Sequence, residues 1–305
     1  MQLKSKNKTH GYFSRFRDVL AQHFKGDGMI DSRDDNALGT GNLAEKVIGL
    51  AKKLSTLAPD KTETLLSLIN AGLKPGSGEE EQYRLAEALS ATIYPKYKFS
   101  EFARLFLEDE GFLNYYKRFM DADNWHSFDR KYTLDQLLKL TFHLPGDLVE
   151  CGTYKGASAY LMCRAHRNSE KSIHLFDSFE GLSSPDPCDG SYWKAGALRI
   201  SEGALRETLA EFRNYQVYKG WMPERFIDVS EKCFCFLHID VDLYQPTLTS
   251  LDFFYERITT GGMILLDDYG FKTCPGTKRA VDQFFNNRPE NIIMLSTGQA
   301  FIIKQ

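Results

Sequence analysis

Four aspartates stand where two short apolar runs end, and their type and spacing suggest chemistry. Asp240 and Asp242 follow FCFLHI, and Asp267 and Asp268 follow GGMILL. If the two runs are neighbouring parallel strands, their carboxyl ends meet at one edge of a sheet. Carboxylates that close repel one another and raise each other's pKa unless a cation is bound. Since oxygen ligands favour magnesium, manganese or calcium over zinc, we predict that Asp240, Asp267 and Asp268 hold a hard divalent cation.

Two residues near these ligands have open interpretations. Strand alternation turns Asp242 differently from its neighbour, so it is either part of the site or a solvated strand end or helix cap. His238 precedes Asp240 by two residues and is expected to face the same side. His238 is therefore a candidate for supporting a metal ligand or for proton transfer, and an ordinary buried histidine is the alternative.

The segment LVECGTYKGASAYLM predicts a strand, a glycine-bearing turn and a helix. Such a turn presents free backbone N–H groups to a ligand, and Gly152 and Gly156 let the backbone approach it. The Glu150 carboxylate can accept hydrogen bonds from an amino group or ribose hydroxyls. Asp177 stands at the end of the next apolar run. In nucleotide-binding sites of this kind, an acidic residue at that position hydrogen-bonds the two ribose hydroxyls. Trp221, after a third run, either stacks on an adenine or caps the core.

The elements that position these residues differ between the two halves of the chain. Between about 42 and 142, apolar residues recur every three or four positions and predict helices, with capping-box spacing such as that of Thr133 and Gln136 at their starts. After Pro145, short apolar runs alternate with helical stretches, which is typical of an α/β domain with a mainly parallel sheet. The predicted strands are DLVECG, SIHLFDS, YQVYKG, CFCFLHID, GMILLDDY, NIIML and QAFIIK. We expect the last two to pair antiparallel, because only STGQ joins them.

These patterns divide the chain into three parts. Residues 1–40 are polar and predicted to be partly flexible, 41–124 form a helical N-terminal region, and 125–305 form the catalytic domain. Within that domain, the segment from Gly181 to Gly203 is rich in turn formers and has Tyr192 and Trp193 at its middle. It is either a lid over the acceptor or an ordinary surface loop.

Composition narrows the class of partner. The 305 residues carry a formal net charge of -3, which gives no general attraction to nucleic acid or to an anionic membrane. The chain shows neither an apolar run of membrane-spanning length nor one of signal-peptide length at its start. Six cysteines without paired spacing predict reduced thiols. We therefore expect a cytoplasmic protein that acts on a small-molecule or glycosylated acceptor, with no nucleic-acid or membrane partner.

In this order, the segments VECGTYKGAS, FDSFEGL, KGW, HIDVDLYQPT and LLDDYG resemble the macrocin O-methyltransferase (TylF-like) family of sugar methyltransferases, over about residues 125–305. The resemblance implies a class I methyltransferase (Rossmann-like) fold with a doubly wound, mostly parallel, seven-stranded sheet. It implies that S-adenosylmethionine is bound by Glu150, Gly152, Thr153, Tyr154, Gly156, Ser158, Asp177, Ser178 and Trp221. It also implies magnesium on Asp240, Asp267 and Asp268, with Asp240 as the proton acceptor or beside it.

The implied reaction is metal-dependent methyl transfer from S-adenosylmethionine to a hydroxyl on a sugar of a natural product or glycan. A nicotinamide-dependent oxidoreductase is one alternative, but Tyr154 stands where its GxGxxG turn has a glycine. The other alternative is a catalytically silent module that keeps the fold, and the retained acids argue against it.

The chain departs from the family in two ways. The family commonly has a shorter N-terminal part, and its usual DGD is here Asp240, Val241 and Asp242. The added helices could form a homo-oligomer, recruit a carrier protein or cover the acceptor site, and the sequence does not choose among these roles.

Overall fold

The computed structural model describes residues 56, 78–93, 105–119 and 127–305. The chain divides into two compact units, Met1–Phe106 and Leu107–Gln305. In the first unit the main described element is helix α4 (Glu79–Ile93). The flexible segment predicted at 1–40 and most of the helices predicted before residue 105 lie outside the described residues.

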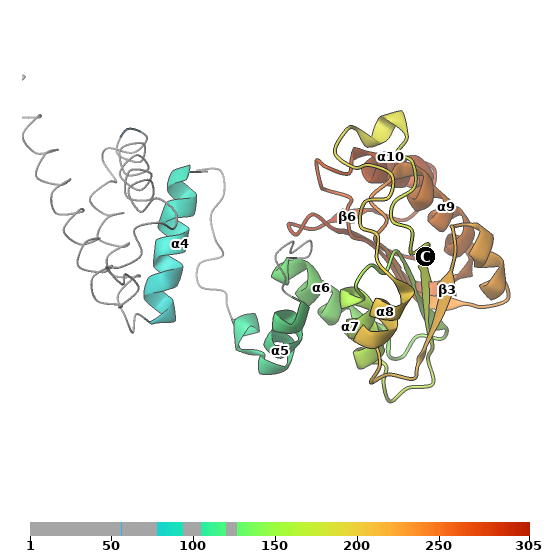
Figure 1. Ribbon diagram of the computed structural model, residues 1–305, viewed down its shortest axis with the longest axis horizontal. Coiled ribbons are helices and arrows are strands. Elements are labelled where there is room, and N and C mark those ends of the chain that lie inside the picture. The colour runs from blue at the N-terminus through green and yellow to red at the C-terminus, as the bar shows by residue number, and fades with distance from the viewer. Residues whose placement is uncertain (1–55, 57–77, 94–104, 120–126) are drawn as a thin grey trace, which may run out of the picture. The chain divides into compact units, whose positions relative to one another are not determined.

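The second unit contains a seven-stranded sheet in the order β3-β2-β1-β4-β5-β7-β6 (Figure 1). The strands are β1 (Asp147–Cys151), β2 (Ile173–Asp177), β3 (Tyr215–Lys219), β4 (Phe234–Ile239), β5 (Ile258–Leu266), β6 (Ile293–Met294) and β7 (Ala300–Ile303). Strands β1 to β5 pair in parallel, whereas β7 is antiparallel to both β5 and β6. The structure thus confirms the doubly wound, mostly parallel sheet and the antiparallel pair at its end. Strand β5 begins at Ile258, before the predicted start at Gly262, because its first residues also pair with β4.

Two apolar layers enclose this sheet, because successive strand residues face opposite sides. On one face, strand residues such as Val149 and Leu237 form a cluster with residues of helices α9 (Tyr244–Phe254) and α10 (Pro275–Phe285). On the other face, Leu148 and Phe236 form a cluster with four further helices. These are α5 (Glu110–Phe119), α6 (Phe128–Leu138), α7 (Ala157–Ala165) and α8 (Glu202–Thr208).

The sequence also placed the start of helix α6 wrongly. Its N-cap is Ser127, so Thr133 lies inside the helix and does not cap it. Apolar packing before Thr133 explains the difference, because Phe128 and Tyr132 also pack against the cluster that contains α7, with their rings 4.9 and 5.1 Å from that of Phe112. Packing on α7 extends the helix toward its N-terminus and brings Arg130 and Lys131 into the interior, where cations are rare unless paired.

Short 3-10 helices join the main elements: η1 (Leu105–Glu108), η2 (Lys139–Thr141), η3 (Pro187–Asp189), η4 (Glu224–Val229) and η5 (Tyr255–Arg257). The η3 helix ties the segment from Gly181 to Gly203 to the rest of the domain, since the buried Asp189 carboxylate accepts hydrogen bonds from Tyr244 N at 2.7 Å and Asp186 N at 2.7 Å. All six cysteines are free thiols, as predicted. Among the described residues, none of the helices has the length and apolar character needed to cross a membrane.

Candidate active site

A cavity of about 690 Å³ opens where the sheet order reverses, beyond the carboxyl ends of β1, β2 and β4. This is the place where doubly wound sheets bind ligands. Of the predicted site residues, the cavity is lined by Gly152, Thr153, Tyr154, Ser158, Asp177, Ser178, Trp221, Asp240 and Asp268. Glu150, Gly156 and Asp267 are not among its lining residues. The structure therefore brings most of the predicted cofactor residues and two predicted metal ligands to one space.

The turn after β1 has a shape that only glycine allows. Gly152 has φ +83°, and a Cβ atom there would lie 1.9 Å from the carbonyl oxygen of Asp240. Asp177 holds the same turn from the next strand, because its carboxylate accepts Thr153 N at 2.9 Å and Tyr154 N at 3.2 Å. It also accepts Phe179 N at 2.7 Å. Asp177 thus shapes the turn as well as lining the cavity.

Glu150 lies beneath this turn and is completely buried. Its Oε1 accepts a hydrogen bond from His238 Nδ1 at 2.9 Å, whereas its buried Oε2 has no hydrogen-bond partner. Burial raises the pKa of Glu150 above its usual value, although the hydrogen bond from His238 opposes the rise. Oε2 is therefore a buried acceptor whose hydrogen bond is not made among the described residues.

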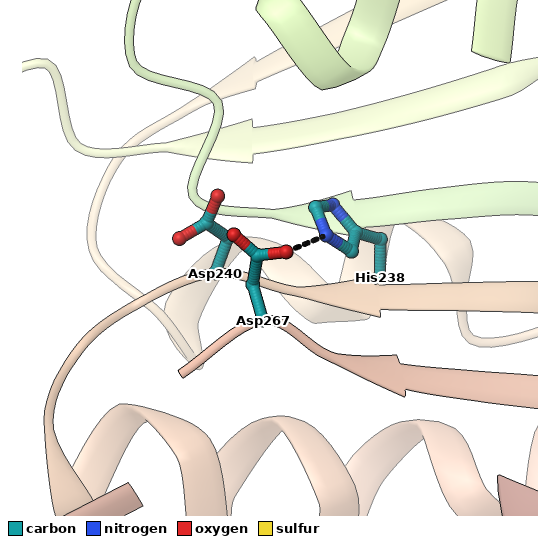
Figure 2. Close-up of side chains that lie close together, drawn as sticks. All are labelled: His238, Asp240 and Asp267. Atoms are coloured by element: carbon teal, nitrogen blue, oxygen red, sulfur yellow. Dashed lines mark hydrogen bonds and ion pairs between the residues drawn. The ribbon is translucent and has the colours of Figure 1, made fainter. Parts of the chain in front are cut away.

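His238 bridges the two predicted sites. Figure 2 shows the imidazole directed at Asp267, with Asp240 beside it, and the distance from Nε2 to Asp267 Oδ1 is 3.5 Å. Burial lowers the pKa of His238, but hydrogen bonds to Asp267 and Glu150 outweigh burial and raise the pKa to about 9. The two carboxylates therefore favour the protonated form of the imidazole. The prediction that it faces the same side as Asp240 is confirmed.

Two cations from α6 enter the aspartate cluster, and sequence reasoning missed both. The Arg130 guanidinium is paired with Asp267, and its Nη2 lies 3.9 Å from Asp268 Oδ1. Lys131 Nζ lies 3.8 Å from Asp240 Oδ2 and 3.7 Å from Asp267 Oδ2. The only sequence signal was two adjacent cations near the start of a helix, which is equally typical of a solvated surface.

The predicted metal ligands fall into two groups of possible ligand atoms. Atoms of His238, Asp240 and Asp267 lie within 4.8 Å of one another, and atoms of Asp242, Asp268 and Cys274 also lie within 4.8 Å. Asp267 and Asp268 separate because adjacent residues at a strand end turn to opposite sides. Asp268 instead accepts Asp242 N at 3.1 Å, so Asp242 is a buried part of the cluster and not a solvated strand end.

The electrostatics of the cluster fit a divalent cation. Burial and neighbouring carboxylates raise the pKa of Asp240 and Asp268, and they raise that of Asp242 to about 7. For Asp267, Arg130 and Lys131 overcome the effect of burial and hold the pKa well below its usual range. The cluster contains five carboxylates, of Glu150, Asp240, Asp242, Asp267 and Asp268, and three cations, of Arg130, Lys131 and His238. If all are ionised, the negative charges exceed the positive ones by two, and a divalent cation would balance them.

The segment from Gly181 to Gly203 contributes aromatic side chains to the same cavity. Tyr192 and Trp193 both line it, with Leu198 from the same segment and Phe271 opposite. The Trp193 indole N–H donates to Cys274 Sγ at 3.3 Å, which joins the segment to the start of α10. Aromatic faces therefore stand next to the acidic cluster.

Comparison with known proteins identifies the family. Residues 133–296 match the model of the Macrocin-O-methyltransferase (TylF) family. The chain is 30% identical over 161 residues to the demethyldecarbamoylnovobiocin O-methyltransferase of Streptomyces niveus, covering 47% of this chain and 59% of that protein. It is 29% identical over 147 residues to the 8-demethyl-8-(2,3-dimethoxy-alpha-L-rhamnosyl)-tetracenomycin-C 4'-O-methyltransferase of Streptomyces olivaceus, covering 43% of this chain and 56% of that protein. The chain thus spans less than two thirds of the length of either relative.

Two solved structures share the fold. The O-methyltransferase NovP has a TM-score of 0.51 and 22% identity, with 59% of this chain and 81% of that chain covered. A calicheamicin methyltransferase has a TM-score of 0.51 and 17% identity, with 80% of this chain and 93% of that chain covered. The fold is the class I methyltransferase fold that the motifs implied. The family match includes all of the predicted site residues, and the chain belongs to the macrocin O-methyltransferase (TylF) family.

Proposed function

We propose that this chain transfers a methyl group from S-adenosylmethionine to a hydroxyl of a sugar or of another part of a natural product. Family membership supports the reaction, and the names of the two relatives describe O-methylation of natural products. The observation that carries the proposal is the shared cavity, which Gly152 and Asp177 line together with Asp240. A methyl donor on the glycine turn and a hydroxyl near Asp240 would meet there in one enclosed space.

The cofactor would lie along the turn after β1 and the end of β2. Thr153, Tyr154, Ser158 and Ser178 offer polar groups along that wall of the cavity. The Trp221 ring is 37% exposed and lines the cavity, which suits stacking on an adenine. Glu150 is buried beneath the turn and does not line the cavity, so its role in binding the cofactor stays a prediction; a cofactor hydroxyl or amino group would reach its unpartnered Oε2 only if the turn moved. S-adenosylmethionine itself supplies the reactive methyl group.

We include magnesium, or another hard divalent cation, held by Asp240, Asp267 and Asp268. The charge imbalance of the cluster and the neighbouring oxygen donors of Asp240 and Asp267 support this part of the proposal, whereas the Asp268 carboxylate lies in the other group and would have to turn toward them. A bound cation would lower the pKa of the acceptor hydroxyl. Asp240 is the partly exposed member of the three and lines the cavity, so it is our candidate for receiving the hydroxyl proton or orienting the group that does.

Tyr192 and Trp193 would pack against the acceptor, because aromatic faces suit the apolar faces of a sugar ring. The division at about residue 125, the role of the N-terminal helices, a homo-oligomer and the cytoplasmic location stay predictions.

Titration calorimetry tests the proposal most directly. Metal-stripped protein is titrated with S-adenosylhomocysteine, with and without magnesium, and then tested for metal-dependent consumption of S-adenosylmethionine on a panel of sugars. We expect binding in the micromolar range, about -8 kcal/mol. If the folded protein does not bind S-adenosylhomocysteine, the silent module becomes the better explanation. If it binds and transfers methyl groups equally well without a divalent ion, only the metal part of the proposal fails.

A further inference from the structure

Arg130 occupies the space between two of the proposed metal ligands. Its guanidinium pairs with Asp267 Oδ2 and lies 3.9 Å from Asp268 Oδ1. The side chain is only 10% exposed, and its Cζ lies 4.8 Å from the centre of the Phe271 ring. The buried Arg130 guanidinium thus lies between the carboxylates of Asp267 and Asp268, which turn to opposite sides.

Both oxygens of Asp267 accept a hydrogen bond while Arg130 is paired. Oδ1 accepts Gln299 Nε2 at 2.5 Å and faces His238 Nε2 at 3.5 Å. Oδ2 is taken by Arg130 and lies 3.7 Å from Lys131 Nζ. A hard divalent cation binds a carboxylate oxygen at roughly 2.0–2.6 Å. An ion that close to Asp267 would also be close to the donor groups that already surround its two oxygens. A divalent cation at Oδ2 would therefore stand beside the positive charges of Arg130 and Lys131, and it would compete with the Arg130 guanidinium for this oxygen.

Of these groups, Arg130 is the one with space to move. Lys131 is held by a hydrogen bond of 2.6 Å to Ser158 Oγ and is only 2% exposed, and His238 and Gln299 are fully buried. Arg130 and Lys131 both line the cavity, but the Arg130 side chain is the more exposed of the two, at 10% against 2%. Arg130 is the third residue of α6, which begins at Phe128, so its side chain projects from the first turn of the helix.

We propose that Arg130 is a built-in competitor of the divalent cation: its guanidinium compensates Asp267 in the metal-free protein and withdraws into the cavity when an ion binds. This inference rests on the metal site in the proposed function. Because binding of the ion then includes the free energy of breaking the ion pair, Arg130 lowers the affinity for metal. It also links metal loading to the first turn of α6.

Calorimetric titration of metal-free, full-length protein with Mn²⁺ and Mg²⁺ tests the competition without any assay of activity. We expect Arg130→Met to bind either ion at least about tenfold more tightly than the unmodified protein, since the competing pair is gone. Lys139→Met is the matched control. It removes one positive charge just after the same helix, from a side chain that contacts only Gln136 in the described hydrogen bonds, and should leave the affinity unchanged.

Arg130→Lys separates competition from a simple change of charge and serves if Arg130→Met does not fold. A lysine keeps the charge but lacks the planar fork that pairs with a carboxylate, so we expect tighter metal binding than in the unmodified protein. Circular dichroism and thermal unfolding show whether each variant is folded.

The possible outcomes distinguish this inference from the proposed function. Equal metal affinity in the unmodified protein and both Arg130 variants, or a gain in Arg130→Met alone with none in Arg130→Lys, would overturn the competition and leave the metal site standing. If no folded variant binds either ion but all bind S-adenosylhomocysteine, both the competition and the metal site fail, while methyl transfer is retained.

Discussion

Individual carboxylates in this chain have separable tasks. Asp177 holds backbone N–H groups of the cofactor turn, whereas Asp240 contributes its side chain to the cavity wall and to the acidic cluster. The hydrogen bonds of Asp177 do not include Asp240, and the contacts of the Asp240 side chain do not include Asp177. Substitution of each should therefore affect a different step.

Asp240→Asn is expected to abolish methyl transfer, because an amide can neither accept the hydroxyl proton nor supply a negative ligand. Binding of S-adenosylhomocysteine should change by less than about twofold, since the glycine turn is untouched. Calorimetry and a methyl-transfer assay on the same preparation check this. A loss of cofactor binding as large as the loss of activity would contradict the assigned role.

Asp177→Ala is expected to weaken binding of S-adenosylhomocysteine by about tenfold or more. The carboxylate accepts three backbone N–H groups, and charged hydrogen bonds of this kind contribute roughly 1.5–3 kcal/mol. Calorimetry measures the change, and thermal unfolding checks that the variant is folded. Unaltered cofactor affinity would show that the turn keeps its shape without Asp177.

Among the elements, the turn between β1 and α7 depends on one close approach of two backbones. Gly152→Ala should greatly reduce cofactor binding and destabilise the protein, because the new Cβ would lie 1.9 Å from a carbonyl oxygen. Gly196→Ala is the matched control, since Gly196 has a similar φ of +78° and nothing within 4 Å of its Cβ position. The control should cost only about 1 kcal/mol from backbone strain. Thermal unfolding of both variants is the measurement, and equal effects would rule out the steric explanation.

Helix α6 is positioned by the packing of its apolar face, and this packing places Arg130 and Lys131 beside the aspartates. Leu134→Ala should lower the free energy of unfolding by about 2–4 kcal/mol, because Leu134 is fully buried beside α7. Leu140→Ala should change it by less than about 0.5 kcal/mol, since Leu140 is 59% exposed. Urea unfolding measures both. Similar small losses would mean that α6 contributes little to the stability of the domain.

For the molecule as a whole, one carboxylate joins three strands at the amino end of the sheet. Asp147 in β1 accepts Ser172 N at 3.0 Å, lies 3.0 Å from His174 Nε2, and is paired with Lys232 before β4 at 3.2 Å. Burial would raise the pKa of Asp147, but the hydrogen bonds, that of His174 first, lower it to about 2 from 3.8. A lowered pKa in the folded state stabilises the protein above the unfolded-state pKa.

Asp147→Asn should therefore lower the free energy of unfolding by about 1–2 kcal/mol at pH 7, a value reduced for the partial exposure of the side chain. The difference from the unmodified protein should stay constant down to about pH 5 and shrink between about pH 4 and pH 2. Denaturant unfolding at several pH values checks this, with the exposed Asp252→Asn on α9 as control. A difference that does not depend on pH would show that the ionised carboxylate is not the cause.

Much of the fold could be predicted from the sequence because local patterns encode it. Apolar runs of strand length predicted all seven strands, and the short STGQ link predicted the antiparallel pair β6 and β7. Acids at the ends of β2, β4 and β5, with Gly152 after β1, predicted the edge of the sheet at which the cavity lies, because parallel strands present their carboxyl ends at one edge. The motifs also predicted the family, which the comparison confirmed.

Tertiary structure alone decided how the charges in the site are paired. Arg130 and Asp267 are 137 positions apart, and nothing in the local pattern of either links them. Strand alternation and burial then turn Glu150 toward His238 and divide Asp267 from Asp268. Sequence periodicity shows which face of an element is apolar, but the partner of a buried charge depends on which elements pack together. For this protein, the sequence determined the types of group at the sheet edge, and the packing of α6 on the sheet determined which cations neutralise them.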